Sequence, residues 1–139
     1  MTFVTRSSEA PAPPSILTVN GDPNICECFA DLLTSKGYAV ESVLYGEACF
    51  ACIQHRAFSA VILHDRLPDM NGLLLLTAIR MIRPELPVIV TTVSRPSPSA
   101  LLQYAFAVLA LPYRREELLD ILQQAIFPTT TSTPKVQVD

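Results

Sequence analysis

Asp65 stands where a carboxylate could take part in chemistry. It follows a short apolar run, 60–63, whose length and β-branched residues predict a buried strand. The stretch 68–72, rich in turn-forming residues, then predicts a loop before a second apolar run begins at Leu73. In open α/β sheets, ligands bind in the crevice beyond the carboxyl ends of the strands. The order of strand, loop and helix therefore predicts that Asp65 lies at the mouth of such a sheet.

Two neighbours of Asp65 carry groups that could act with it. His64 directly precedes it and Arg66 directly follows it. Because side chains alternate along a strand, we expect His64 to point away from Asp65 and to be a packed or rim residue. A hydrogen bond from His64 to a group on Asp65 is the alternative. Arg66 is expected to be a solvated surface side chain, and a contribution of its charge to the site is the alternative.

The cysteines form a second candidate group. Cys26 and Cys28 are two residues apart, and Cys49 and Cys52 have the C-x-x-C spacing of a redox or metal half-site. Four thiolates could bind zinc, but neither pair lies in the Gly-rich knuckle that usually presents such ligands. We therefore expect free thiols that pack as small apolar side chains.

The elements that must position Asp65 follow an alternating pattern. Short apolar strands alternate with segments of helical periodicity, and Asp22 or Asn24 is expected to cap the first helix, with Pro23 as its first residue. This alternation predicts a parallel sheet covered by helices on both faces. The expected strands are 16–19, 38–44, 60–63, 88–92 and 107–111, and the later expected helices are 46–56, 73–82, one ending near 106, and 114–126.

Length and composition indicate one globular domain of 139 residues, with half of the residues apolar. We expect a disordered leader at 1–14, a domain at 15–127 and a disordered polar tail at 128–139. The net charge is −3 without a basic stripe, which disfavours nucleic acid as a partner. No apolar run approaches the roughly 18 residues that span a membrane, and the N-terminus lacks the apolar segment of a secretory signal. A cytoplasmic protein is therefore expected.

Over residues 15–127 the sequence resembles the receiver domain of two-component response regulators. The resemblance rests on Val19–Pro23, on Asp65 with the stretch 67–72 behind it, on 87–92 and on Leu111-Pro112. It implies an α/β, flavodoxin-like, doubly wound fold with five helices and a five-stranded parallel sheet of order 2-1-3-4-5. It also implies a signalling module rather than an enzyme.

The resemblance assigns roles to two residues. Asp65 matches the aspartate that accepts a phosphoryl group from a histidine kinase or a small phosphodonor, and Thr92 matches the switch hydroxyl that binds this group. Because an anionic carboxylate attacks an anionic group, the reaction needs positive charge around the transferred oxygens. The family supplies a magnesium ion, held by acids after the first strand, and a lysine after the fifth.

The sequence departs from the family where this positive charge is supplied. Asn20 and Gly21 occupy the positions of the metal-binding acids, Asp22 aligns one place later, and Leu111 occupies the position of the lysine. The resemblance then leaves Asp22 and Asp65 as the candidates to bind Mg²⁺. Losing one carboxylate matters because Mg²⁺ requires oxygen ligands in near-octahedral geometry.

Three hypotheses remain open from the residues. The first is a receiver that is phosphorylated at Asp65 through an altered acidic pocket, with a histidine kinase or another signalling protein as its partner. The second is a pseudoreceiver that binds partners without phosphorylation. The third is a small flavodoxin-like redox or metal protein that uses the cysteines. Apolar residues in the fourth helix and fifth strand favour docking or a homodimer through the face of the fourth helix, fifth strand and fifth helix.

Overall fold

The computed structural model describes residues 12–94, 98–128 and 136–138. Each strand has three to five residues and leads into a helix or follows one. The strands are β1 (Ser15–Val19), β2 (Ala39–Val43), β3 (Ala60–His64), β4 (Val88–Thr92), β5 (Ala107–Ala110) and β6 (Val136–Val138). The helices are α1 (Pro23–Ser35), α2 (Gly46–His55), α3 (Gly72–Ile82), α4 (Ser99–Tyr104) and α5 (Arg115–Ile126).

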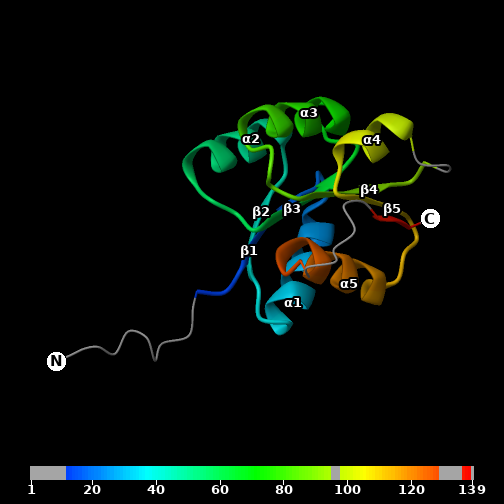
Figure 1. Ribbon diagram of the computed structural model, residues 1–139. Helices are drawn as coiled ribbons and strands as arrows, with labels where there is room; N and C mark the ends of the chain where they lie inside the picture. Colours follow the sequence, from blue (N-terminus) through cyan, green and yellow to red (C-terminus); the bar gives the residue numbers. More distant parts are fainter. Residues whose placement is uncertain (1–11, 95–97, 129–135, 139) are drawn as a thin grey trace.

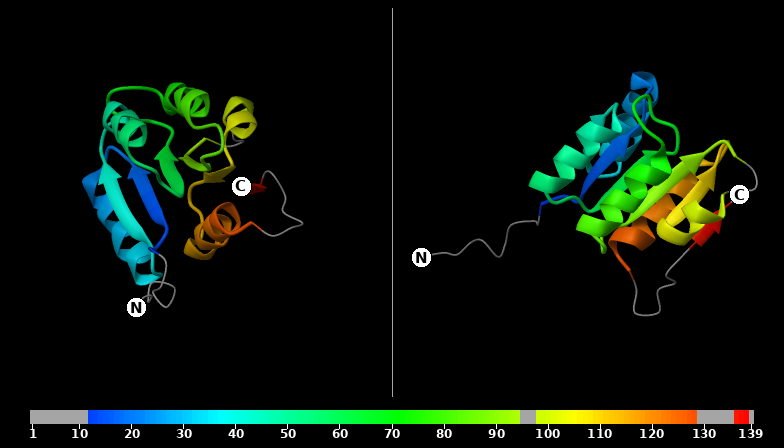
Figure 2. Two further views of the ribbon diagram at one scale, coloured as in Figure 1. Left: turned by 60° about the vertical axis from the view of Figure 1, so that its left-hand side comes forward. Right: turned by 90° about the horizontal axis from the view of Figure 1, so that it is seen from above.

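The strands form one parallel sheet of order β2-β1-β3-β4-β5-β6 over the described residues. The first five strands have the predicted order 2-1-3-4-5, and the predicted flavodoxin-like fold with five helices is confirmed. The expectation of a tail without strand structure is wrong for Val136–Val138, which pairs in parallel with Ala107–Leu109 at the sheet edge (Figure 2). Residues 1–11 of the predicted leader and residues 129–135 and 139 of the predicted tail lie outside the described residues.

Helices cover both faces of the sheet, with α2, α3 and α4 on one side and α1 and α5 on the other (Figure 1). Alternating strand residues divide between the two resulting cores. In β3, Val61 and Leu63 pack under α2 and α3, while Ala60 and Ile62 pack against α1 and α5. β3, β4 and β5 are buried on both faces apart from the half-buried His64, whereas the edge strand β2 has no buried residue.

The helix starts follow from local hydrogen bonding. The Asp22 carboxylate accepts a hydrogen bond from the backbone N–H of Asn24 at 2.9 Å, and Pro23 is the first residue of α1, as predicted. The Asn71 side chain caps α3 in the same way, so α3 begins at Gly72, one residue before the predicted start. Helix α4 ends at Tyr104 and is shorter than predicted. Among the described residues, no helix combines the length and hydrophobicity needed to cross a membrane.

Candidate functional site at the carboxyl edge of the sheet

The backbone around Asp65 is held on two sides. Its N–H donates to the carbonyl of Thr91 on β4 at 3.0 Å, and its carbonyl accepts from the N–H of Gly72 at 2.8 Å. The intervening loop is closed by an antiparallel bridge between Arg66 and Asn71. A Cβ on Gly72 would stand 2.6 Å from the Asp65 Cα, so α3 begins in direct contact with the Asp65 backbone. The first turn of α3 thereby fixes where Asp65 lies.

The Asp65 carboxylate is bound on one oxygen and unpartnered on the other. The Thr92 hydroxyl donates to Asp65 Oδ2 at 2.8 Å, as the retained pair in the sequence suggested. Asp65 Oδ1 is buried, and among the described residues it has no hydrogen-bond partner. Such an orphan acceptor is uncommon in folded proteins, where most buried polar atoms are paired.

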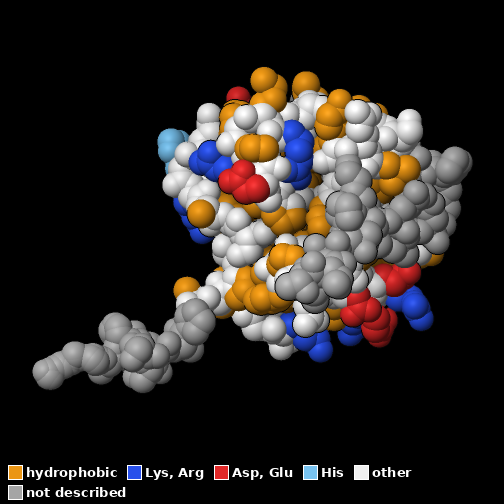
Figure 3. Space-filling view, in the orientation of Figure 1, with side chains coloured by type: hydrophobic (Ala, Val, Ile, Leu, Met, Phe, Trp, Pro, Cys, Tyr) orange, Lys and Arg blue, Asp and Glu red, His pale blue; other side chains and the backbone are white. Residues whose placement is uncertain are grey.

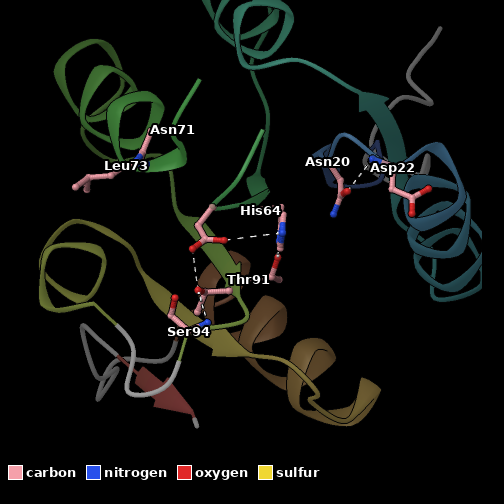
Figure 4. Close-up of polar contacts among 9 residues, drawn as sticks. Asn20, Asp22, His64, Asn71, Leu73, Thr91 and Ser94 are labelled. Atoms are coloured by element: carbon pink, nitrogen blue, oxygen red, sulfur yellow. Dashed lines mark hydrogen bonds and ion pairs between the residues drawn. The ribbon is translucent and has the colours of Figure 1, made fainter. Parts of the chain in front are cut away.

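Thr92 links Asp65 to the loop after β4. The backbone N–H of Ser94 donates to Thr92 Oγ1 at 3.0 Å, while the same hydroxyl gives its proton to Asp65 (Figure 4). Thr92 is fully buried at the end of β4. One hydroxyl therefore contacts Asp65 on one side and the loop that precedes α4 on the other.

His64 is a packed residue, as expected, and its side chain bonds to Thr91, whereas Asp65 bonds to Thr92, the next residue of β4. Its Nδ1 lies 3.0 Å from Thr91 Oγ1, and its Nε2 lies 3.9 Å from Asp65 Oδ1. Strand β3 ends at His64. Alternation therefore directs the two side chains to successive residues of β4, and only the edge of the imidazole comes near the carboxylate.

The positions that carry metal-binding acids in the family are used differently. Asn20 is 6% exposed, and its Oδ1 accepts a hydrogen bond from the N–H of Asp22 at 2.9 Å. The Asp22 carboxylate is exposed, caps α1 and points away from His64 (Figure 4). Gly21 has no side chain, and a Cβ there would stand 2.9 Å from Cδ of Pro68. The structure therefore does not bring Asp22 to Asp65, and Pro68 takes the space beside Gly21.

Of the two carboxylates that the sequence offers to a magnesium ion, only that of Asp65 lies at this site, because the Asp22 carboxylate caps α1. Mg²⁺ is bound through oxygen ligands in near-octahedral geometry, usually with one or two carboxylates. Among the described residues, no group of three or more His, Cys, Asp or Glu side chains is placed to hold a metal. In the part of the chain that the structure describes, Asp65 Oδ1 is the one buried side-chain oxygen or nitrogen without a hydrogen-bond partner.

Leu111, at the family's lysine position, faces a different part of the molecule. It is half-buried and lines a cavity of about 660 Å³ between α1 and α5, with Phe29, Tyr113 and Leu118 among the other lining residues. Its backbone N–H donates to the Thr92 carbonyl at 2.7 Å. Leu111 thus brings no charge to the site.

Asp69 is a structural residue of the site that the sequence did not reveal. Its two carboxylate oxygens accept hydrogen bonds from the N–H groups of Gly46 and Glu47, at 2.9 and 3.0 Å. These bonds hold the pKa of Asp69 below its usual value. Helix α2 has no side-chain cap of its own at Tyr45, and an uncapped helix start is the one signal that a remote carboxylate was needed.

The cysteines do not assemble into a site among the described residues. All four are free; Cys26 and Cys49 are buried, Cys52 is half-buried and Cys28 is exposed. Burial raises the pKa of Cys49 to about 12, which keeps it a neutral thiol. The expectation of free packing thiols is confirmed for the buried pair, and no described cluster supports the redox or metal hypothesis.

Comparison with known proteins places this geometry in a family. The model of the "Response regulator receiver domain" matches residues 16–123. The chain is 27% identical over 124 residues to the transcriptional regulatory protein GlrR of Escherichia coli K12. This match covers 87% of this chain and 28% of that protein. It is 33% identical over 111 residues to the response regulator FleR of Pseudomonas aeruginosa, covering 77% of this chain and 23% of that protein. The chain thus spans about a quarter of the length of these curated relatives.

Solved structures agree on the fold. A CheY-like receiver domain from Methanospirillum hungatei superimposes with a TM-score of 0.77 at 26% identity, covering 82% of this chain and 94% of that one. The response regulator TrrA of Thermotoga maritima, solved in complex with Mg²⁺–BeF, superimposes with a TM-score of 0.75 at 23% identity, covering 81% and 98%. Since the family model spans most of the chain and the fold agrees, this protein belongs to the response regulator receiver domain family.

Proposed function

We propose that this receiver domain accepts a phosphoryl group on Asp65, from a histidine kinase or a small acyl phosphate, and passes the change on through Thr92. The observation that carries the proposal is the hydrogen bond from Thr92 to Asp65 Oδ2, at the edge of the sheet where ligands of this fold bind. A carboxylate that served only as a solvated loop acid would not need a fully buried hydroxyl donor on the neighbouring strand.

The hydrogen bonds also suggest how the signal leaves the site. Thr92 has one hydroxyl proton, which it gives to Asp65 while it accepts from the Ser94 N–H. When a phosphoryl oxygen becomes the better acceptor, the hydroxyl turns towards it and its lone pairs turn away from Ser94. The backbone N–H of Ser94 then loses this hydrogen bond, and the balance between its bonded and released states shifts.

A pseudoreceiver is the second candidate, and two observations favour it. Asp65 Oδ1 is buried, and Oδ2 accepts a hydrogen bond from Thr92, so one oxygen is shielded and the other already has a partner in this conformation. The acidic pocket is reduced, because Gly21 is packed under Pro68 and Asp22 caps α1. In this case the domain acts by docking alone.

The partner surface remains a proposal. We propose docking or homodimer formation through the face of α4, β5 and α5, where Tyr104 is 39% exposed. Leu101, in the same helix, is buried in the core. Apolar side chains are also visible over α3 in Figure 3, where Leu74 is 61% and Met81 is 84% exposed. Size-exclusion chromatography with light scattering, on the wild type and on Tyr104→Ser and Met81→Ser, identifies which face mediates self-association.

Intact-mass measurement tests the phosphoacceptor role. The full chain is incubated with acetyl phosphate and Mg²⁺ beside an Asp65→Asn variant and a receiver that is known to be phosphorylated. A phosphate adduct on the wild type that is absent from Asp65→Asn supports phosphotransfer, and Asp22→Ala then shows whether Asp22 contributes. No adduct on the wild type, while the reference receiver is modified, would rule out the phosphotransfer proposal and leave the pseudoreceiver.

A further inference from the structure

The His64 imidazole is held between a buried hydroxyl and the Asp65 carboxylate. Its Nδ1 lies 3.0 Å from Oγ1 of Thr91, which is 3% exposed, and its Nε2 faces Asp65 Oδ1 at 3.9 Å. The side chain of His64 is 21% exposed, and that of Asp65 is 12% exposed. The ring is therefore fixed at one nitrogen and presents the other to the candidate phosphoacceptor (Figure 4).

The hydrogen bonds indicate which nitrogen carries the proton. If Nδ1–H donated to Thr91, a neutral ring would turn the lone pair of Nε2 towards the anionic oxygen of Asp65, which is repulsive. If the Thr91 hydroxyl donates to Nδ1, the proton of the neutral ring lies on Nε2 and faces Asp65. We assign the second arrangement, so Nε2–H is a donor aimed at the carboxylate.

Among the described residues, Nε2–H faces Asp65 Oδ1 without forming a hydrogen bond to it. The 3.9 Å separation is about 1 Å longer than a normal hydrogen bond. The facing oxygen, Oδ1, is the buried acceptor that lacks a partner among the described residues. A donor and an acceptor that face each other without bonding suit a site that closes around an additional group.

The His64 ring also approaches Asp65 from the side of Leu111, which occupies the position of the family's lysine. His64 pairs with Thr91 in the register of β3 and β4, and Thr91 pairs with Leu109. His64, Thr91 and Leu109 therefore share the face covered by α1 and α5, and Leu111 lines the cavity between these two helices. His64 thus reaches Asp65 from the same face on which Leu111 stands without a charged side chain.

We infer that His64 binds the phosphoryl group on Asp65 through Nε2–H and supplies the hydrogen bond that the Leu111 side chain cannot. The inference rests on the proposed phosphoacceptor role of Asp65. In the transfer from an acyl phosphate, an Asp65 oxygen forms the new O–P bond while the P–O bond of the donor breaks and its carboxylate leaves with the electron pair. His64 keeps its proton throughout and stabilises the transferred oxygens. Thr91 is a positioning residue, because it acts only by holding the ring.

The two histidines of the chain allow a direct test. The full chain is labelled with ¹⁵N-histidine and treated with beryllium fluoride and Mg²⁺, and the ring nitrogens are followed by NMR while ¹⁹F signals report loading. We expect the Nε2 resonance of His64 to shift on loading, while that of His55, which is exposed on α2, stays in place. Loading without a shift of His64 overturns this inference alone. Absence of loading counts against the phosphoacceptor proposal as well, and the ¹⁹F signal distinguishes the two failures.

Variants give an independent readout through the rate of modification by acetyl phosphate. We expect His64→Leu to slow phosphorylation about tenfold or more, since it removes a donor to the transferred oxygens. His64→Gln, which places an amide N–H near Nε2, should retain the rate to within about threefold. The phosphorylation rate of Thr91→Val should lie between the rates of these two variants. His55→Gln is the matched control and should not change the rate.

Folding of each variant is checked by urea unfolding, and the Gln variant and the NMR shift still test the inference if His64→Leu does not fold. A His64→Leu protein that folds and is phosphorylated at the wild-type rate overturns the inference. Equal slowing of His64→Leu and His64→Gln also overturns it, because the conservative variant would then show that packing rather than hydrogen bonding is lost.

Discussion

The ring of Pro68 lies against Gly21, with its Cδ 2.9 Å from the place of a Cβ on that glycine. This contact crosses the site from the loop after β3 to the loop after β1. Glycine at position 21 therefore removes the charge of the family's acidic residue, and the ring of Pro68 fills the space where that side chain would lie. Restoring the acid must therefore displace the loop that carries Asp65.

We expect Gly21→Asp to destabilise the fold by about 1–3 kcal/mol, because the new side chain overpacks a filled space. Urea unfolding measures this loss. The double variant Gly21→Asp/Pro68→Ala should recover part of the stability, since the ring that clashes is gone. If the loss of stability in the double variant equals the sum of the losses in Gly21→Asp and Pro68→Ala, the two side chains do not compete for this space.

Gly72→Ala should perturb stability and the Asp65 site together. The added Cβ would stand 2.6 Å from the Cα of Asp65 and 2.8 Å from its carbonyl oxygen, which are backbone atoms with little freedom to move. We expect a loss of about 1–3 kcal/mol on urea unfolding, with a change in the amide NMR resonance of Asp65.

Gly37→Ala is the matched control for Gly72→Ala. Gly37 has a φ of 94°, and among the described residues no atom lies within 4 Å of the place of a Cβ, so alanine is strained only by the backbone. It should cost about 1–2 kcal/mol and leave the resonance of Asp65 unchanged. The same resonance change in both variants would argue against a specific contact between Gly72 and Asp65.

Asp69 should make stability depend on pH in the acidic range. Its pKa is lowered by the N–H groups of Gly46 and Glu47, so the folded state favours the carboxylate more than the unfolded state does. This stabilisation is present above the ordinary pKa of 3.8 and is lost as the pH falls through the lower folded pKa. Urea unfolding of wild type and Asp69→Asn at about pH 6 and about pH 3 should show a difference that shrinks at the lower pH. A difference that is the same at both values would contradict the role of the charge.

Arg80 should anchor the connection between α3 and β4. Its guanidinium donates to the carbonyls of Tyr104, Pro84 and Leu86, and burial lowers its pKa. We expect Arg80→Met to lose about 1–3 kcal/mol, because these carbonyls lose a charged donor. Arg83→Met is the control, since Arg83 donates to the adjacent carbonyl of Ile82. Equal losses of unfolding free energy in Arg80→Met and Arg83→Met would show that the hydrogen bonds of Arg80 do not stabilise the fold more than the single bond of Arg83 does.

The cysteines should differ in their reaction with iodoacetamide. At about pH 8, we expect the buried Cys49, with its pKa of about 12, to react more than about 100-fold more slowly than the exposed Cys28, because the thiolate is the nucleophile. Peptide mass spectrometry of the alkylated protein gives the order of modification. In urea the two rates should become similar, and rapid labelling of Cys49 in the native protein would contradict its burial.

The sheet order was predictable because it rests on patterns that are local in the sequence, whereas the resemblance to the receiver family is what linked Asp65 with Thr92, 27 residues away. Short apolar runs and turn residues mark each of the first five strands, Thr92 ends β4, and Asp65 directly follows β3. The N-cap at Asp22 was predictable for the same reason, since a cap is a contact between residues two apart.

The rest of the site depends on contacts that no local pattern contains. Asp69 caps α2 across 22 or 23 residues, and Pro68 fills the space beside Gly21 from another loop. Strand alternation gave the packed orientation of His64, but the 3.9 Å approach of its Nε2 to Asp65 depends on how the chain turns after β3 ends. Val136–Val138 was missed because three residues between polar neighbours carry too little periodicity to mark a strand.

The central place of β1 in the sheet has a consequence for synthesis of the chain. Ile16 pairs with Val40 on one side and with Ala60 on the other, so β1 gains its second neighbour only after β3 has been made. At about 5–20 residues per second, the roughly 45 residues between them take about 2–9 s to translate. During this interval β1, with the apolar residues Ile16, Leu17 and Val19, has an unpaired edge, which is a template for association with other chains. The parallel order that places Asp65 correctly therefore also makes the early chain dependent on rapid completion of its sheet.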